Sequence, residues 1–216
     1  MSLMPPDALL FIAPGCPHCP GALSALSELL KQGKIGRLEA VNVAVHPERA
    51  AALGVRSAPW TRLGEFEFSG AQTPDDLQRW LNLAARSDGV SLYLEQLLKE
   101  GQLDQAEQRL RQRPDWLEHV LTLLGTPEQP LQVRLGISAL FESMAGHAEL
   151  EKLVPALGEL TLAQDAGVRA DACHYLGLSG SQAAAAILQA CLQDDSEEVR
   201  EIARDGLESL QQLPAP

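Results

Sequence analysis

Apolar residues in the first 86 positions change repeatedly from strand-like spacing to helical spacing. Continuous or alternating apolar runs predict strands, and apolar residues three and four apart predict helices. The expected elements, in chain order, are a strand over 8–13, a helix over 23–30 that ends at Gly33, a strand over 38–45, a short helix over 48–53, a strand near 60–63, a strand over 65–68 and a helix over 74–84. Thr73 should cap that last helix, with Pro74 in its first turn. This order predicts a sheet covered by helices.

From about residue 90 onward the chain carries only helical spacing. Two short helices are predicted over 92–98 and 103–110, separated by Gly101 and closed by Pro114. A Val-Arg dipeptide then recurs at Val133, Val168 and Val199, at intervals of 35 and 31 residues. Each dipeptide begins an apolar helical stripe, and the helices expected before them cover 117–124, 150–160 and 183–192. Helix pairs at this period predict an α-solenoid, in which neighbouring units bury one another's apolar faces.

Composition limits the classes of protein that fit these patterns. With 216 residues, of which 45% are hydrophobic, the chain has room for two small cores. Its longest apolar run is far shorter than the ~20 residues that span a bilayer. The opening residues lack the basic and apolar pattern of a signal peptide, so we expect the protein to act in the reducing cytoplasm.

The acidic residues are concentrated in the second half of the chain. Residues 1–89 carry a net charge of −1, whereas residues 90–216 carry −11. A surplus of negative charge of this size repels nucleic acid and anionic lipid. We therefore expect neither nucleic acid nor a membrane as a partner.

The strongest chemical signal is Cys16-Pro17-His18-Cys19, which lies after the first predicted strand and at the start of the first predicted helix. The unpaired N–H groups and partial positive charge of a helix start favour a thiolate on Cys16. Cys19 can then attack a mixed disulfide on Cys16 and release the product. His18 would lower the pKa of Cys16 further, although an exposed histidine that merely follows Pro17 is the alternative.

A Cys-X-X-Cys motif also supplies two ligands to structural zinc sites. Zinc needs two further ligands at short spacing, but Cys173 and Cys191 lie in the other half of the chain and His46 has no partner at such spacing. We therefore expect no metal. Cys173 and Cys191 lie in apolar helical patterns and are expected to be buried free thiols; the alternative is a disulfide that joins adjacent repeats.

Residues 7–86 resemble the thioredoxin superfamily, both at the cysteine motif and at a second stretch over 46–60 that ends in Ala58-Pro59-Trp60. The resemblance implies that Pro59 is a cis-proline facing Cys16 and that the Ala58 backbone pairs with a substrate strand. Trp60 would then form an apolar docking surface, or else pack in the interior.

The details of the motif resemble particular branches of that superfamily. Pro17-His18 resembles the oxidising DsbA group, and Pro20 resembles the glutaredoxin-like protein disulfide oxidoreductases. Leu10 and Ala40 stand where thioredoxin itself has a buried aspartate and a nearby lysine. The resemblance therefore does not imply the reductant role of thioredoxin.

Residues 115–210 resemble HEAT repeats of the short bacterial type, on the Val-Arg helix starts together with Asp165, Ala172 and Leu176-Gly177. Arrays of this type bind proteins, scaffold complexes or cap other domains. The predicted fold is thus an α/β N-terminal thioredoxin-like domain over 4–88, a helical connector over 89–114, and an all-α C-terminal HEAT-like α-solenoid over 115–212.

The leading hypothesis is a cytoplasmic thiol–disulfide oxidoreductase that needs no cofactor. Its redox-active disulfide would be Cys16–Cys19, with His18 and Pro17 as further catalytic residues, and its substrate-binding residues would be Ala58, Pro59 and Trp60. The expected partners are protein clients with disulfides or thiols, and a protein that docks on the solenoid. One alternative is an interaction scaffold whose redox site is vestigial or regulatory. Another is an iron–sulfur or glutathione-dependent glutaredoxin-like protein.

Overall fold

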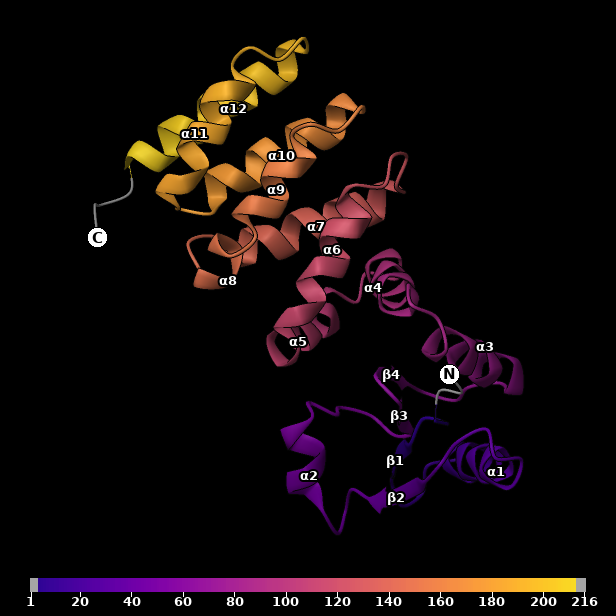
Figure 1. Cartoon of the computed structure of the whole chain (residues 1–216). Helices are drawn as coiled ribbons and strands as arrows, with labels where there is room; N and C mark the ends of the chain where they lie inside the picture. Colours follow the sequence, from indigo (N-terminus) through magenta and orange to yellow (C-terminus); the bar gives the residue numbers. More distant parts are fainter. Residues whose placement is uncertain (1–3, 213–216) are drawn as a thin grey trace. The chain divides into compact units, whose positions relative to one another are not determined.

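The computed structural model describes residues 4–212 (Figure 1). The chain divides into two compact units, one up to Tyr93 and one from Leu94. The division falls within helix α4 (Gly89–Lys99). The domain boundaries expected from the sequence remain predictions.

The first unit contains a four-stranded sheet with helices on both sides (Figure 1). Its elements are β1 (Ala8–Ile12), α1 (Cys19–Lys31), β2 (Leu38–Asn42), α2 (Pro47–Ala52), β3 (Trp60–Leu63), β4 (Phe66–Ser69) and α3 (Pro74–Ala84). The strand order is β2-β1-β3-β4, with β1 parallel to β2 and antiparallel to β3, and β3 antiparallel to β4. The sheet and helices expected from the apolar spacing, including the strand near 60–63, are confirmed.

Strand β2 ends three residues earlier than the valine alternation predicts. The Asn42 side chain accepts a hydrogen bond from the Ala44 N–H at 2.9 Å. The Asn42 carbonyl accepts from the N–H groups of Val45 and His46. These bonds close a turn, because asparagine binds its own local backbone readily. As a result Val41 is buried whereas Val45 is 65% exposed.

Helix α3 begins at the predicted cap. The Asp76 N–H donates to Thr73 Oγ1 at 3.1 Å, and the Thr73 N–H donates to Asp76 Oδ2 at 3.1 Å. The hydrogen bonds from Thr73 lower the pKa of Asp76. Asp76 therefore completes a reciprocal capping box.

The outer strand β4 is bound by a tyrosine from helix α4. The Tyr93 hydroxyl donates to the Glu67 carbonyl oxygen at 3.0 Å and accepts from the Glu67 N–H at 3.3 Å. Tyr93 is completely buried, and its ring contacts Phe66 and Trp80. One side chain thus satisfies both main-chain polar groups of Glu67.

The second unit is entirely helical over its described residues, 94–212, and its helices lie side by side in chain order (Figure 1). After α4 come α5 (Leu103–Gln112), a short 3₁₀ helix (Pro114–Trp116), α6 (Leu117–Leu124), α7 (Leu131–Ser143), α8 (Ala148–Glu151), α9 (Val154–Leu160), α10 (Ala166–Leu178), α11 (Gln182–Cys191) and α12 (Glu197–Gln212). The valines of the three Val-Arg dipeptides are all buried. The repeating helix–turn–helix pattern of the sequence is therefore confirmed.

The single helix expected over 150–160 is wrong, because the structure divides it into α8 and α9. Pro155 lies in the first turn of α9 and has no N–H to donate to the Glu151 carbonyl. Proline also disfavours helical geometry in the residue before it. The helix therefore stops and restarts around Leu153.

Helices α10 and α12 approach each other closely at two glycines. A Cβ atom added to Gly177 would lie 2.7 Å from the Gly206 Cα atom. Tyr175 stacks on Phe141 of α7 with ring centroids 4.2 Å apart. Neighbouring repeats are thus packed tightly on both sides of α10.

Within residues 4–212, no helix has the length and apolar character needed to cross a membrane.

Candidate redox site

Cys16 and Cys19 form a disulfide between strand β1 and helix α1, with their Cα atoms 5.5 Å apart. The turn that carries Cys16 depends on Gly15, whose φ of 74° lies in the left-handed region that favours glycine. The Cys16 N–H donates to the Ala13 carbonyl at 3.3 Å and closes this turn. Cys19 is only 5% exposed, whereas Cys16 is partly exposed. Of the two cysteines, Cys16 is the more exposed residue.

Helix α1 begins at Cys19, so Cys16 lies ahead of the helix and not in its first turn. Pro20 explains the difference from the expected helix start, because it has no N–H to donate to the Cys16 carbonyl. That carbonyl instead accepts from the Cys19 N–H at 3.4 Å. Helix α1 therefore begins three residues after Cys16, whereas the sequence pattern placed Cys16 at the helix start.

The sheet brings Cys16 next to Ala58, a residue 42 positions away in the sequence. Phe11 of β1 lies opposite Trp60 of β3 in antiparallel register, so the chain leaves β1 at the same end of the sheet where it enters β3. Cys16 Sγ lies 3.5 Å from the Ala58 carbonyl oxygen. The peptide bond between Ala58 and Pro59 is cis. In the reduced protein this carbonyl is placed to accept a hydrogen bond from the Cys16 thiol.

The other predicted residues of the motif lie on the surface. Pro17 and His18 are exposed. His18 immediately precedes α1, and its side chain makes no hydrogen bond that caps the helix. Their catalytic roles therefore remain predictions.

Trp60 lies in the interior of the first unit. Its side chain is 5% exposed and packs with Leu9, Phe11, Val41 and Ala50, with its ring centroid 5.5 Å from that of Phe11. This burial favours the alternative in which Trp60 is a packed aromatic side chain beneath the site.

The two positions at which the sequence departs from thioredoxin lie side by side. Leu10 pairs with Ala40 in the register of β1 and β2, and Leu10 is completely buried. Neither side chain can accept a proton. Two apolar side chains thus stand at the positions of the aspartate and lysine of thioredoxin.

Two polar features were missed at the level of sequence. Asp76 completes the cap described above, and Arg169 binds Asp194 across two repeats. Cys173 and Cys191 are free and buried, as expected. Among residues 4–212, no group of three or more His, Cys, Asp or Glu side chains could hold a metal ion.

Comparisons with known families agree with this geometry in both halves of the chain. Residues 9–82 match the family described as a thioredoxin domain. Residues 117–208 match the family described as HEAT repeats. No curated protein matched the chain. The chain therefore carries a thioredoxin-like domain followed by HEAT repeats.

Proposed function

We propose that this protein is a thiol–disulfide oxidoreductase that acts on protein disulfides through Cys16 and Cys19. The observation that carries the proposal is the position of Cys16, which is disulfide-bonded to a buried Cys19 and lies 3.5 Å from the Ala58 carbonyl. A reactive cysteine beside a resolving cysteine, next to a backbone carbonyl, has the parts needed for disulfide exchange.

In the reducing direction, the Cys16 thiolate attacks one sulfur of a client disulfide. The other client sulfur leaves as a thiolate and takes up a proton. Cys19 then attacks the Cys16 sulfur, which forms the Cys16–Cys19 disulfide and releases the second client thiol. The same steps in reverse oxidise a client dithiol. The reaction transfers two electrons between two dithiol pairs, and no cofactor takes part in it.

The residues around Cys16 have distinct tasks in this proposal. The Ala58 carbonyl accepts an N–H group of an extended client segment, and Pro59 offers no N–H that would compete. Exposed Pro17 and His18 border the reactive sulfur. A protonated His18 would stabilise the Cys16 thiolate, which favours the dithiol and makes the disulfide more oxidising. Trp60 supports the Pro59 loop from below.

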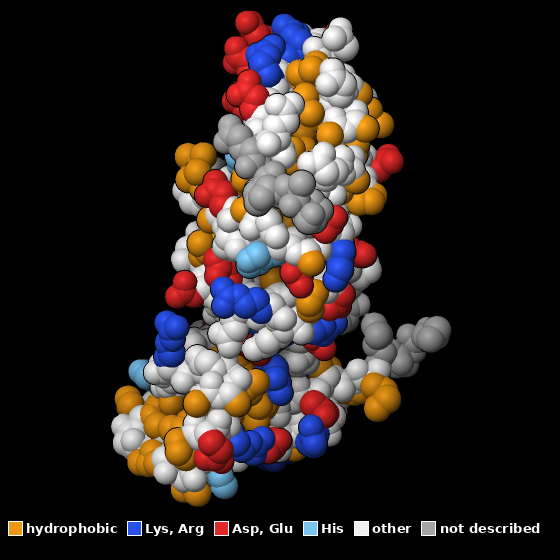
Figure 2. Space-filling view, turned by 90° about the vertical axis from the view of Figure 1, so that its left-hand side faces the viewer, with side chains coloured by type: hydrophobic (Ala, Val, Ile, Leu, Met, Phe, Trp, Pro, Cys, Tyr) orange, Lys and Arg blue, Asp and Glu red, His pale blue; other side chains and the backbone are white. Residues whose placement is uncertain are grey.

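The HEAT-like unit supplies protein recruitment in this proposal. Helix-pair arrays present extended surfaces to protein partners. Residues 90–216 carry a net charge of −11, and Figure 2 shows acidic side chains spread along this unit among apolar and basic ones. We expect the docking face of the partner to be basic and its binding to weaken as salt is added.

A trapping experiment tests the proposed reaction. In the full chain, Cys19→Ser should hold clients as mixed disulfides on Cys16, since nothing remains to resolve them. Cys16→Ser is the matched control and should trap none. Equal trapping by the two variants would exclude Cys16 as the nucleophile. If neither variant traps clients while a chain lacking both cysteines still binds a protein partner, the scaffold alternative holds.

Differential alkylation tests the assignment of the nucleophile. After reduction, iodoacetamide should modify Cys16 well before Cys19, because Cys19 is only 5% exposed. Peptide mass spectrometry at increasing times gives both rates. Equal rates in the native protein would contradict the assignment.

The reduction potential of the Cys16–Cys19 pair decides the direction of electron flow. A potential near ~−270 mV would indicate a thioredoxin-like reductant, and one near ~−120 mV an oxidant. The absorption spectrum of the purified protein tests the iron–sulfur alternative, which requires colour.

A further inference from the structure

The HEAT-like unit contains an open cavity of about 350 Å³, whose walls come from α5, α6, α7 and α8 (labelled in Figure 1). Leu110 of α5, Leu117 of α6 and Leu140 of α7 line the cavity, and none of them is more than 5% exposed. Half-buried Met144, which follows α7, lines it as well. Pockets that bind ligands have volumes of about 300–1,000 Å³ and mainly apolar walls. The cavity therefore has the size and the apolar floor of a binding pocket.

The polar side chains of the cavity wall leave a negative charge unpaired. Arg111 donates a hydrogen bond to Glu107 at 2.6 Å, so these two charges neutralise each other. The Ser143 hydroxyl donates to the Leu140 carbonyl at 2.9 Å. The carboxylate of Glu149, an exposed residue of α8, has no hydrogen bond or ion pair with any residue that the structure describes. It is therefore available to a ligand.

These groups favour an amphipathic ligand that carries a positive charge. An apolar body would displace water from the leucines and from Met144. A cation next to that body would meet the Glu149 carboxylate, and the imidazole of His147 on the same wall can donate or accept a further hydrogen bond. An anion would find Arg111 already bound and would be repelled by the net charge of −11 on residues 90–216.

We propose that this cavity anchors the protein partner of the HEAT-like unit, by enclosing a large apolar side chain of the partner while Glu149 binds a lysine or arginine beside it. The inference rests on the recruitment role proposed above, and adds the place and the chemistry of the contact. Protein interfaces draw most of their binding energy from a few side chains, often aromatic, that fill pockets. Met144 is suited to such a wall, because methionine adapts its shape to the group that it contacts.

The methionines of the chain give a local readout of binding. The full chain contains three. Met144 lines the cavity, whereas Met4 lies in the first unit and is 89% exposed. With isotope-labelled methionine methyl groups, NMR follows each signal, and Met144→Leu identifies the one from the cavity. A saturable shift of the Met144 signal, with the Met4 signal unchanged, would report occupation of the cavity.

The probes are three dipeptides with blocked ends, used at millimolar concentrations. Trp-Lys carries both the apolar group and the cation, and it should shift the Met144 signal saturably. Trp-Glu replaces the cation with an anion, and Ala-Lys lacks the large apolar side chain. Each of these two should need a higher concentration than Trp-Lys for half of the maximal shift, because one of the two contacts is lost.

Two substitutions in the full chain test the two contacts separately. Ser143→Trp should fill the cavity and abolish the response to Trp-Lys, whereas Gln132→Trp, at an exposed position of the same helix, should keep it. Glu149→Gln should raise the Trp-Lys concentration for half of the maximal shift about twofold to fivefold, as expected for an exposed ion pair. Glu159→Gln is the matched control, because Glu159 is exposed and does not line the cavity, and it should have no effect.

The absence of a saturable Met144 shift with Trp-Lys would overturn the proposal, and so would equal binding of Trp-Lys and Trp-Glu. A response to hexylammonium without one to Trp-Lys would also overturn it, because the cavity would then bind a free amine. The outcome is independent of redox chemistry, so Cys16→Ser should bind Trp-Lys normally. Trapping by Cys19→Ser without a Met144 response would refute this inference alone, and a Met144 response without trapping would refute only the proposed reaction.

Discussion

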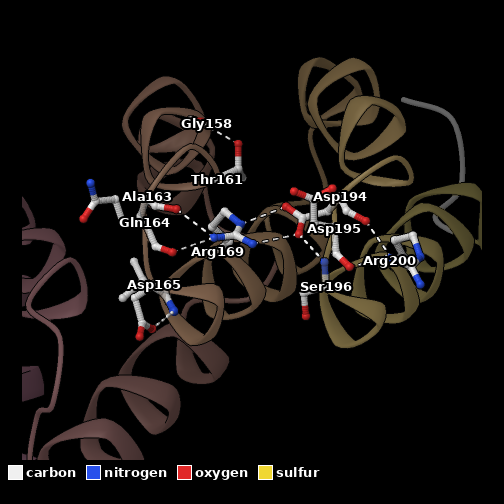
Figure 3. A network of polar contacts seen from close by, with 11 residues as sticks. Gly158, Thr161, Ala163, Gln164, Asp165, Arg169, Asp194, Asp195, Ser196 and Arg200 are labelled. Carbon is white, nitrogen blue, oxygen red and sulfur yellow. Dashed lines mark hydrogen bonds and ion pairs between the residues drawn. The ribbon is translucent and has the colours of Figure 1, made fainter.

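Removal of Arg169 should weaken the HEAT-like unit. Its guanidinium donates two hydrogen bonds to Asp194, each 2.8 Å long, and two more to the carbonyls of Ala163 and Gln164, each 2.9 Å long (Figure 3). The side chains of Arg169 and Asp194 are only 16% and 12% exposed. One side chain thus joins α10 to the loop before it and to the loop before α12.

The expected magnitude follows from this burial. Removing one partner of a buried ion pair costs about 3–5 kcal/mol, because the remaining charge stays buried without compensation. The cost of Arg169→Ala in unfolding free energy should lie near the lower end of this range, at about 3 kcal/mol, since the remaining exposure lets water solvate part of the Asp194 carboxylate. Asp194 also keeps its 2.8 Å bond from the Ser196 N–H.

Arg134 provides the matched control, because it occupies the same position in the preceding repeat. It binds Asp171 at 2.9 Å, but their side chains are 51% and 30% exposed. Arg134→Ala should therefore cost only about 0–1 kcal/mol. The free energy of unfolding of both variants is measured by unfolding in urea, monitored by far-ultraviolet circular dichroism. Equal losses of stability for the two arginines would refute the argument from burial.

The pH dependence gives an independent check on the same pair. Hydrogen bonds from Arg169 lower the pKa of Asp194 below its usual value of 3.8. A carboxyl group whose pKa is depressed by folding contributes stability above its unfolded pKa, and this contribution is lost as the pH falls through the folded pKa. The difference in unfolding free energy between the parent protein and Arg169→Ala should therefore have its full value at pH 7 and become smaller below about pH 4. A difference that stays constant into acid would mean that the pair is not its source.

Two further substitutions test packing and the outer strand. Gly177→Ala should destabilise the protein by about 1–3 kcal/mol, because its Cβ would meet the Gly206 Cα at 2.7 Å. Gly21→Ala is the control and should be neutral or stabilising, because its Cβ would meet open space. Equal changes in the free energy of unfolding for the two variants would contradict this packing argument. Tyr93→Phe should cost about 1–3 kcal/mol, since it leaves the main-chain groups of Glu67 without the hydroxyl that binds both. Unfolding in urea measures the change in stability of each variant. An unchanged urea midpoint for Tyr93→Phe would show that water replaces the hydroxyl.

Local spacing of apolar residues was enough to predict most helices and strands, since each pattern reports which face of an element is buried. It fails where a single residue overrides the pattern. Asn42 ends a strand that the valine alternation continues, and Pro155 divides a helix that the leucine spacing makes continuous. Both failures have local causes that a closer reading of turn and proline chemistry could have found.

Contacts between distant residues required the fold itself. The cysteine motif was evident in the sequence, but the 3.5 Å contact of Cys16 with Ala58 depends on the antiparallel register of β1 and β3. The ion pair between Arg169 and Asp194 depends on how two repeats pack, which spacing along one helix does not determine. The resemblance to thioredoxins anticipated the first contact, and nothing in the sequence anticipated the second.

The bond between Tyr93 and β4 also bears on association between copies of the chain. An outer strand presents unpaired N–H and carbonyl groups on which another chain can add a strand, and exposed edges of this kind lead to aggregation. The Tyr93 hydroxyl occupies one such N–H and carbonyl pair at Glu67, in the middle of a four-residue strand. A chain cut after residue 88 would lose this side chain and present the whole edge of β4 to its neighbours. Helix α4 therefore protects the edge of β4 from strand addition, and a truncated thioredoxin-like unit should keep α4 through Tyr93 to avoid association through that edge.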